Sequence, residues 1–462
     1  MTLLSKVKIG LEIHMPLNTK SKLFCPCKTK SKSPNTATCE VCLGMPGSKP
    51  VLNKKALEFA VMLSLALSCK VSKESRFDRK TYFYPDLPKN YQITQYNSPI
   101  SENGQVLVQG KIIRIRRVQL EEDPGSITYP YHIDISKYSL IDYNRSGVPL
   151  CEIVTDPDFS SSKEVKQFLK QIISIAKHLK IYTSDKSFRV DTNVSIGRNP
   201  RVEIKNIGSI KDVVSAIECE VFRQQQEIEN GQKIKQETRR FSGSSTMLMR
   251  EKETEEDYGY IIDPDLPTLF INTIQIRKIQ KSMPELPDQR MQRMMKQYKL
   301  NKSQAQAIVS EKELADFYER VAKDIDSKLA ASWISTQLLK VLNYNNLSFS
   351  ETHLEAQHFT PVLNMIQKGK ISDRAAELLL RALVLKPQNS NKLAVKLKLL
   401  TLTDQELSKL TKSVLMKHEK QTNQYKLGDS KILAFLIGRV IKSSKGRADA
   451  KKVRQEIVKY LA

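Results

Sequence analysis

The sequence predicts an α+β protein in which a domain of strands and turns precedes a region of helices. Of the 19 prolines in the 462 residues, 17 lie at or before Pro287, with 12 of the 16 glycines and all seven cysteines. Several segments of this first part alternate apolar and polar side chains, as strands do. The rest of the chain is rich in Leu, Lys, Gln and Ala with helical periods. We therefore place a domain boundary near residue 288.

Four segments of the first part are predicted to be strands. They are residues 7–13, 112–120, 188–196 and 201–207. Side chains alternate between the two faces of a strand. Strict alternation over 112–120 places Ile113, Ile115 and Arg117 on one face and Val118 on the other.

Helices are predicted between and after these strands. Residues 160–179 place a stripe of apolar side chains on one face, as an amphipathic helix does. Ser209 is expected to cap the next helix, with Asp212 three residues on as the acidic partner of a capping box.

The charge of the chain points to a polyanionic partner. Lys and Arg number 75 against 50 Asp and Glu, which gives a net charge of +25. Such a charge most often indicates nucleic acid, although a generally Lys-rich proteome produces the same balance. The longest apolar stretch, residues 57–69, is too short to span a bilayer and contains Glu58. The first ten residues lack the features of a signal peptide, so we expect a cytoplasmic protein with no membrane contact.

Four cysteines form the strongest local signal. Cys25, Cys27, Cys39 and Cys42 form two close pairs among prolines and glycines. Two pairs of thiolates on tight turns suit a tetrahedral Zn²⁺ site, and four protein ligands leave no open position for catalysis. We expect a structural zinc ion, the alternative being four cysteines buried in a core.

A set of acidic residues suggests a second metal site. Glu12 and His14 lie two apart on a predicted strand and share a face, and the LEED segment supplies Glu121 and Glu122. Asp191, Glu203 and Lys205 lie on the polar faces of two other strands. Oxygen ligands with one imidazole suit Mg²⁺ or Mn²⁺ holding nucleotide phosphates. The alternative is a set of ordinary polar residues on half-exposed strands.

Residues 77–96 combine six aromatic side chains with cations that include Lys80 and Lys89. This mixture can stack bases and pair with phosphates, but it is equally typical of an aromatic core strand. GQVLVQGK at 104–111 is not a P-loop, because it has one residue too many between its glycines and lacks the following Ser or Thr.

A dozen motifs in order resemble the B subunit of the aspartyl/glutamyl-tRNA amidotransferases. They include IGLEIH, KSKLFCPC, FDRKTYFYPDLPKNYQITQY, LEEDPG, RVDTNVSI, VEIKNIGS and the terminal AFLIGRVIKSSKGRADAKKVRQEI. The resemblance covers essentially the whole chain. It implies a cradle-shaped kinase domain with a mixed or antiparallel sheet and a zinc-bearing segment over 1–288, a helical domain over 289–398 and a helical tail over 399–462.

The resemblance also implies a function. The B subunit uses ATP to phosphorylate the side-chain carboxylate of Asp on tRNA(Asn) or Glu on tRNA(Gln), and ammonia from an amidase-type glutaminase subunit then gives the amide. A small linker subunit joins the two, and the tail binds the mischarged tRNA. The enzyme is a ligase that forms a carbon–nitrogen bond.

The resemblance assigns roles to individual residues. Those matching the family's metal and nucleotide site are Glu12, His14, Glu122, Asp191 and Glu203, with Glu121, Glu152 and Lys205 as second choices. Lys80 and Lys89 match lysines near that site and the ammonia path. The chain departs from the family pattern at Gln119, Pro124 and Gly259, where the family commonly has His, Ala and Arg.

Two further functional hypotheses belong to other classes. Charge and cysteines alone would favour a non-catalytic zinc-ribbon RNA-binding protein. The ordered carboxylates favour the enzyme, because acids on an RNA-facing surface repel phosphates unless they bind metal. A free-standing glutaminase is excluded by the lack of the amidase Ser-Ser-Lys signature.

Overall fold

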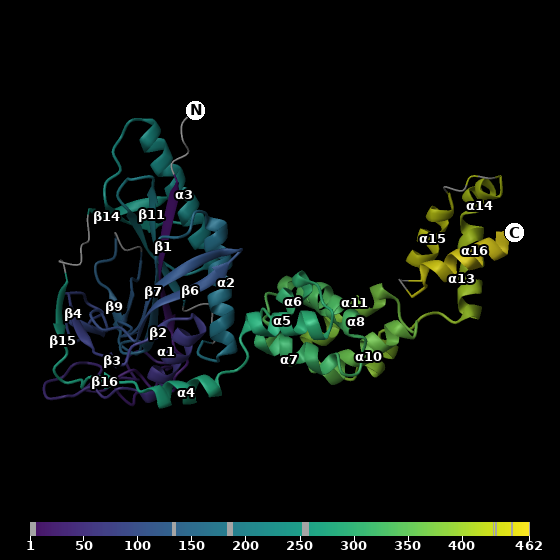
Figure 1. The fold of residues 1–462 in the computed structure, drawn as a ribbon. Helices are drawn as coiled ribbons and strands as arrows, with labels where there is room; N and C mark the ends of the chain where they lie inside the picture. The colour runs from purple at the N-terminus through teal and green to yellow at the C-terminus, as the bar shows by residue number, and fades with distance from the viewer. Residues whose placement is uncertain are drawn as a thin grey trace. The chain divides into compact units, whose positions relative to one another are not determined.

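The computed structural model contains an α+β unit and a helical unit, which span Met1–Leu286 and Pro287–Ala462 (Figure 1). It describes residues 6–131, 135–182, 188–251, 258–427, 429, 432–444 and 447–461. Among these residues, no helix is both long and apolar enough to cross a membrane. A mixed sheet followed by helices confirms the α+β class.

A nine-stranded sheet forms the centre of the first unit, as far as the chain is described. The strand order is β14-β13-β12-β11-β1-β10-β7-β6-β2. Only β12 and β13 run parallel among these pairs, so the sheet is mixed. The strands are β1 (Val7–Pro16), β2 (Lys70–Val71), β6 (Ser101–Val108), β7 (Lys111–Glu122), β10 (Pro149–Thr155), β11 (Arg189–Ile196), β12 (Val202–Ile207), β13 (Glu237–Phe241) and β14 (Thr246–Glu251).

Three helices cover one face of this sheet and share one hydrophobic core with it. They are α1 (Lys54–Ala66), α2 (Ser162–His178) and α3 (Ile210–Glu229). The predicted stripe of α2 is buried in this core, from Val165 to Leu179. The Ser209 hydroxyl accepts a hydrogen bond from the Asp212 amide at 3.0 Å, as predicted, and so begins α3.

Smaller elements complete the first unit. A three-stranded sheet has the order β15-β4-β5, and two pairs of short strands join β16 with β3 and β8 with β9. The remaining bounds are β3 (Glu74–Ser75), β4 (Asp78–Thr81), β5 (Tyr91–Thr94), β8 (Ser126–Thr128), β9 (Leu140–Asp142), β15 (Gly259–Ile262), β16 (Leu269–Phe270) and α4 (Thr273–Ser282).

The prediction of which face of β7 carries Arg117 and Val118 was wrong, and a β-bulge explains the difference. The pairing of β7 with β10 shifts between Val154 and Thr155, so β7 has one more residue than its partner near Arg116 and Arg117. Ile113 and Ile115 lie in the core as predicted, but Val118 joins them. The extra residue reverses the alternation, and Arg117 therefore lies on the face away from the helices.

The helical unit contains two hydrophobic clusters. Helices α5 to α12 share one, and α13 to α16 share the other. The bounds are α5 (Pro287–Gln297), α6 (Lys302–Ile308), α7 (Lys312–Val321), α8 (Ser327–Ser332), the π-helical turn η2 (Trp333–Leu338), α9 (Leu339–Tyr344), the 3₁₀ turn η3 (Phe349–Glu351), α10 (Ala356–Gln367), α11 (Asp373–Leu385), α12 (Ser390–Lys396), α13 (Asp404–Lys417), α14 (Glu419–Lys426), α15 (Ile432–Ser443) and α16 (Ala450–Leu461).

Candidate active site and cysteine cluster

Acidic side chains gather on the sheet face opposite the three helices. Alternation along β1 buries Ile9, Leu11 and Ile13 in the core and turns Glu12 and His14 to the other face. In the ladder, Glu12 lies opposite Asp191 of β11, and His14 lies opposite Glu152 of β10. Strands far apart in sequence thus bring their polar faces together.

These side chains form two compact sets of potential metal ligands. One set is Glu12, Asp191 and Glu203, and the other is His14, Glu121 and Glu152. Within each set, one ligand atom from each residue lies within 4.8 Å of the others. Carboxylates with one imidazole are a donor set that suits Mg²⁺ or Mn²⁺.

Crowding of these carboxylates changes their protonation. Burial, followed by repulsion from Glu152 and then Asp191, raises the pKa of Glu12 to about 7. Burial and the adjacent Glu152 raise the pKa of Glu121 to about 8. Burial lowers the pKa of His14, but the surrounding carboxylates, led by Glu121, outweigh it, so that pKa is raised. Full ionisation of either set is therefore unfavourable without a divalent cation to neutralise its negative charge.

The carboxylates line a pocket that also contains cations and tyrosines. Lys80 and Arg117 line it together with Tyr96, Tyr258 and Tyr260. The Lys80 ammonium lies 4.4 Å from the ring centroid of Tyr258, and the Arg117 guanidinium lies 5.0 Å from that of Tyr96. The rings of Tyr96 and Tyr260 are stacked at 4.2 Å. The pocket thus combines sites for cations with fixed positive groups for an anion.

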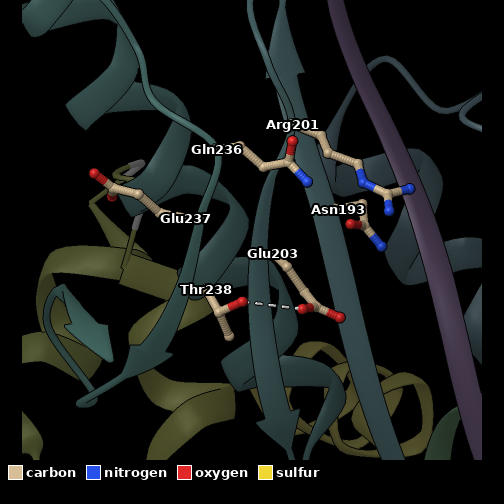
Figure 2. A pocket seen from close by; sticks show the side chains of 6 residues that line it. All are labelled: Asn193, Arg201, Glu203, Gln236, Glu237 and Thr238. Carbon is tan, nitrogen blue, oxygen red and sulfur yellow. Dashed lines mark hydrogen bonds between the residues drawn. The ribbon is translucent and has the colours of Figure 1, made fainter. Parts of the chain in front are cut away.

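A smaller pocket adjoins the first at β12. It is lined by Asn193, Arg201, Glu203, Gln236, Glu237 and Thr238, and Figure 2 shows Glu203 among them, hydrogen-bonded to Thr238. The Thr238 hydroxyl donates to Glu203 at 3.3 Å, and Lys205 lies 3.6 Å from the same carboxylate. Glu203 and Arg201 line both pockets. Hydrogen bonding from β13 therefore helps to orient one carboxylate of the larger site.

Glu122 lies apart from both ligand sets. Its carboxylate pairs with the Lys89 ammonium at 2.5 Å and accepts the Ile93 amide of β5 at 2.9 Å. Consecutive side chains of a strand point to opposite faces, so Glu121 enters the pocket and Glu122 does not. The Lys89 stem packs against Gly44, where a Cβ would lie 2.3 Å from Lys89 Cγ.

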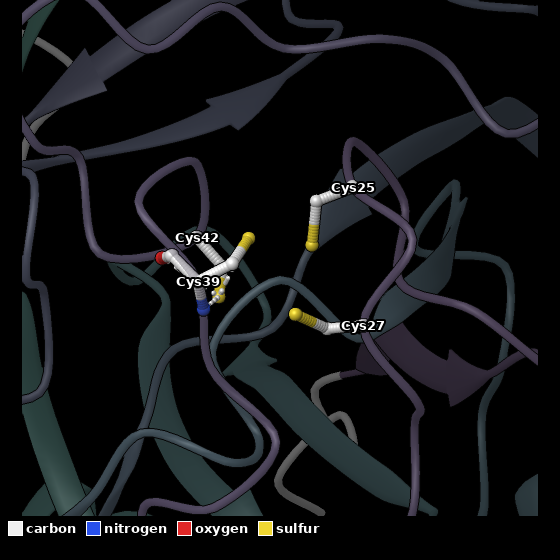
Figure 3. A group of neighbouring side chains, drawn as sticks. All are labelled: Cys25, Cys27, Cys39 and Cys42. Atoms are coloured by element: carbon white, nitrogen blue, oxygen red, sulfur yellow. Dashed lines mark hydrogen bonds between the residues drawn. The ribbon is translucent and has the colours of Figure 1, made fainter.

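The four predicted cysteines converge on one point. Figure 3 shows their sulfur atoms facing a common space, and all four lie within 4.8 Å of one another. The pair Cys25 and Cys27 comes from the turn after β1, and Cys39 and Cys42 come from a second turn before α1. Four converging thiols fit a tetrahedral Zn²⁺ ion.

A buried lysine supports this cluster. Lys22 is fully buried, and its ammonium donates to Cys42 Sγ at 3.4 Å and to the Tyr143 carbonyl at 3.2 Å. A hydrogen bond from the Cys25 thiol, assisted by the Cys39 backbone and the Lys22 charge, lowers the pKa of Cys42 to about 4. At least one thiolate is thus available at neutral pH, as a metal ligand set requires.

Two family models match the chain. The GatB/GatE catalytic domain matches residues 7–277, which include every residue of the pocket and of the cysteine cluster. A second model, the GatB domain, matches residues 316–461 in the helical unit. The chain belongs to the GatB/GatE family.

Curated relatives of this family align over nearly the full length. The protein of Methanosarcina barkeri is 41% identical over 98% of both chains. That of Saccharolobus solfataricus is 40% identical over 98% of this chain and 99% of its own. That of Thermotoga petrophila is 39% identical over 98% of both chains. All three are named as the B subunit of aspartyl/glutamyl-tRNA(Asn/Gln) amidotransferase.

The structure brings together most of the residues predicted for the family's metal and nucleotide site. Glu121 and Glu152, which were second choices, lie in the pocket, and Glu122 does not. The pocket lining and the ligand sets include Glu12, His14, Asp191, Glu203, Lys205 and Lys80. Lys89 is paired with Glu122 outside this lining.

Several pocket residues of this GatB/GatE member had no assigned role in the sequence analysis. They are Thr94, Arg117, Arg201, Tyr258 and Tyr260, whereas Tyr96 belongs to the aromatic segment 77–96 that the sequence singled out. They come from four separate segments, and no spacing rule connects them. A β-bulge places Arg117, and β15, which pairs with β4, brings in Tyr260.

Proposed function

We propose that this chain is the B subunit of a tRNA-dependent amidotransferase, a ligase that converts Asp-tRNA(Asn), Glu-tRNA(Gln) or both to the amide. The observation that carries this proposal is identity near 40% over 98% of the chain to relatives named as that subunit. The acidic pocket supports it, because activation of a carboxylate requires a site for a nucleotide and its metal ions.

The two ligand sets are assigned to divalent cations. Glu12, Asp191 and Glu203 would hold one Mg²⁺ or Mn²⁺ ion, and His14, Glu121 and Glu152 would hold another. The crowded carboxylates and their raised pKa values support this assignment. We replace Glu122 by Glu121 in the second set, because the Glu122 carboxylate lies against Lys89.

ATP supplies a phosphoryl group that makes one carboxylate oxygen of the aminoacyl side chain a good leaving group, so that ammonia can displace it. Lys80 and Arg117 would bind the negative charge of the phosphates and the substrate carboxylate. Their contacts with Tyr258 and Tyr96 hold them in place before substrate enters. Lys205, beside Glu203, is assigned to the same nucleotide site.

Lys89 is assigned a position beside the path of ammonia. The Glu122 carboxylate accepts a hydrogen bond from Lys89 and neutralises it. Glu122 thus holds and neutralises the Lys89 ammonium, and it is not assigned as a ligand of the cations.

The cysteine cluster is assigned to a structural Zn²⁺ ion. Its four thiols supply a complete tetrahedral set, and the turns that carry them anchor the segment between β1 and α1. The GatB/GatE domain would thus form the cradle, with the zinc segment at the end of the sheet where β1 finishes.

The remaining activities belong to partners and to the helical unit. An amidase-type glutaminase subunit would release ammonia from glutamine, and a small linker subunit would join it to this chain. We divide the helical unit into a helical domain and a tail, because each of these two parts has its own hydrophobic cluster. The tail is assigned to tRNA binding.

The test is a reconstituted complex. The chain is co-purified with an amidase-type glutaminase and a small linker protein, then supplied with ATP, glutamine and each mischarged tRNA. We expect ADP formation that depends on mischarged tRNA and conversion of the attached residue to its amide. Tight tRNA binding without ADP formation would instead favour a non-catalytic RNA-binding protein.

A further inference from the structure

Gln119 is a buried side chain of β7 whose NH₂ group donates to Glu152, a member of the ligand set formed by His14, Glu121 and Glu152, and to Thr94 beside that set. It is 3% exposed and lines the acidic pocket. Its Nε2 donates to Glu152 Oε2 at 2.7 Å and to Thr94 Oγ1 at 3.1 Å. The Thr94 hydroxyl in turn donates to Glu121 Oε2 at 3.3 Å. One NH₂ group thus reaches both carboxylates of the set, directly and through one hydroxyl.

The direction of these bonds is fixed by chemistry. An ionised carboxylate is only an acceptor, so the NH₂ end of Gln119 must face Glu152. The carbonyl oxygen then points away and has no hydrogen-bond partner in the described chain. Thr94 accepts from Gln119, which leaves its single hydroxyl hydrogen for Glu121. The network therefore has one consistent donor order from Gln119 to the two carboxylates.

We propose that Gln119 and Thr94 are positioning residues that clamp Glu121 and Glu152 in the orientation needed to bind a divalent cation with His14. Cation binding requires both carboxyls to be ionised, and like charges at this spacing repel, so free carboxylates would rotate apart. Hydrogen bonds to ionised groups are stronger than those between neutral groups and can hold both in place. Residues that orient metal ligands change metal affinity without contacting the ion.

The proposal rests on the assignment of this set to a cation under the proposed function. The test measures binding of Mn²⁺ to the full-length chain without ATP or tRNA. The EPR signal of free Mn²⁺ reports how much of the ion remains unbound. Gln119→Leu removes both donors and the unsatisfied oxygen together. We expect it to raise the Kd of the site by about 10- to 100-fold, as loss of a ligand's supporting partner usually does.

Thr94→Val separates the two arms of the clamp. It keeps the shape of the side chain and removes only the hydroxyl that reaches Glu121, so we expect a smaller rise in Kd. The double variant is expected to raise Kd by less than the product of the single effects, because the residues share one network. Gln119→His retains one N–H for Glu152 and should recover part of the affinity.

Gln92→Leu is the matched control. Gln92 is also buried, but its Nε2 donates to the backbone carbonyl of Glu122 at 2.7 Å and to neither carboxylate of the set. Its Mn²⁺ affinity should stay within about twofold of that of the natural chain, and circular dichroism checks the fold of every variant.

Glu152→Gln distinguishes failure of the clamp from failure of the cation site. If Glu152→Gln weakens Mn²⁺ binding and a folded Gln119→Leu does not, the clamp is wrong and the cation site stands. If neither substitution weakens binding, both the clamp and the assignment of this set to a cation are wrong.

Discussion

Glu121 and Glu122 are neighbours in the chain, but their carboxylates lie in different environments. Glu121 faces His14 at 3.5 Å in the acidic pocket, and Glu122 pairs with Lys89 on the other side of the strand. One carboxylate is therefore crowded by other acids and the other is neutralised by a cation. The two should have different functions, one in cation binding and one in holding Lys89.

Substitution of these two residues should separate activity from stability. Glu121→Gln removes a proposed ligand and should lower tRNA-dependent ATP use about 100-fold, because metal neutralisation of a phosphoryl group contributes several kcal/mol. Glu122→Gln leaves the buried Lys89 without its carboxylate and should lower the free energy of unfolding by about 3–5 kcal/mol. ATP use by the folded enzyme tests the first variant, and unfolding in denaturant tests the second. The reverse pattern would return Glu122 to the cation site.

The raised pKa values of Glu12 and Glu121 predict how stability depends on pH. A carboxyl whose pKa is about 7 when folded and near 4.5 when unfolded holds a proton in the folded chain that the unfolded chain has lost. Stability therefore falls as the pH rises from about 4.5 through 7, by on the order of 3 kcal/mol for Glu12 at zero Mg²⁺, and Glu121 extends the fall to about pH 8.

We expect the melting temperature to fall between pH 5 and pH 8 without Mg²⁺. Millimolar Mg²⁺ should restore it at pH 8 and have little effect at pH 5, where the carboxyls carry protons. Glu121→Gln removes one titrating group and should flatten the curve. A pH dependence that this substitution leaves unchanged would contradict the assignment of the titration to the pocket.

At the scale of elements, two turns and one bulge position the functional groups. The turns after β1 and before α1 each carry two of the clustered cysteines. The bulge of β7 directs Arg117 into the pocket. Regular strand geometry would have placed Arg117 among the helices, where its charge would lack water and a partner.

The zinc content of the purified protein tests whether the cysteine cluster holds a metal ion. We expect about one Zn²⁺ per chain in the natural protein. Cys39→Ser should lose the metal and lower the melting temperature, because one missing thiolate breaks the tetrahedral set. Cys219→Ser is the matched control, since Cys219 lies outside the cluster on α3. Metal analysis that finds no Zn²⁺ in freshly purified natural protein would rule out this site.

At the scale of the whole molecule, basic charge is concentrated toward the C-terminus. Residues 399–462 contain 14 basic and 6 acidic residues. Leu399 packs in the cluster of α5 to α12, whereas Leu402 packs with α13 to α16, so the separate core begins near residue 402. Lys451, Lys452 and Arg454 are exposed on α16. Lys445, which the sequence places with them, lies outside the described residues.

Deletion of residues 402–462 should leave the rest of the chain folded and weaken tRNA binding. Each lost phosphate contact reduces the slope of log affinity against log salt by about 0.7–0.9. Lys451→Ala with Lys452→Ala should give part of this effect, and Lys302→Ala with Lys323→Ala, outside the tail, should give none. Filter binding of mischarged tRNA at several salt concentrations measures both quantities. Unchanged affinity and slope after the deletion would refute the tail assignment.

The sequence by itself determined the local features of this protein. The cysteine spacing predicted one cluster, and the periods of two and 3.6 predicted strands such as 188–196 and the helix at 160–179, because these signals depend on neighbouring residues only. Motif order indicated the family, which the family models confirm.

Only the tertiary structure decided which side chains share the pocket. Alternation alone cannot say whether Glu121 or Glu122 faces the site, since either choice fits a period of two. A single extra residue in β7 reversed the face of Arg117, and strand order brought Glu12 beside Asp191 and His14 beside Glu152. Register and sheet order arise from packing between strands that are separated in the sequence, and no local pattern encodes them.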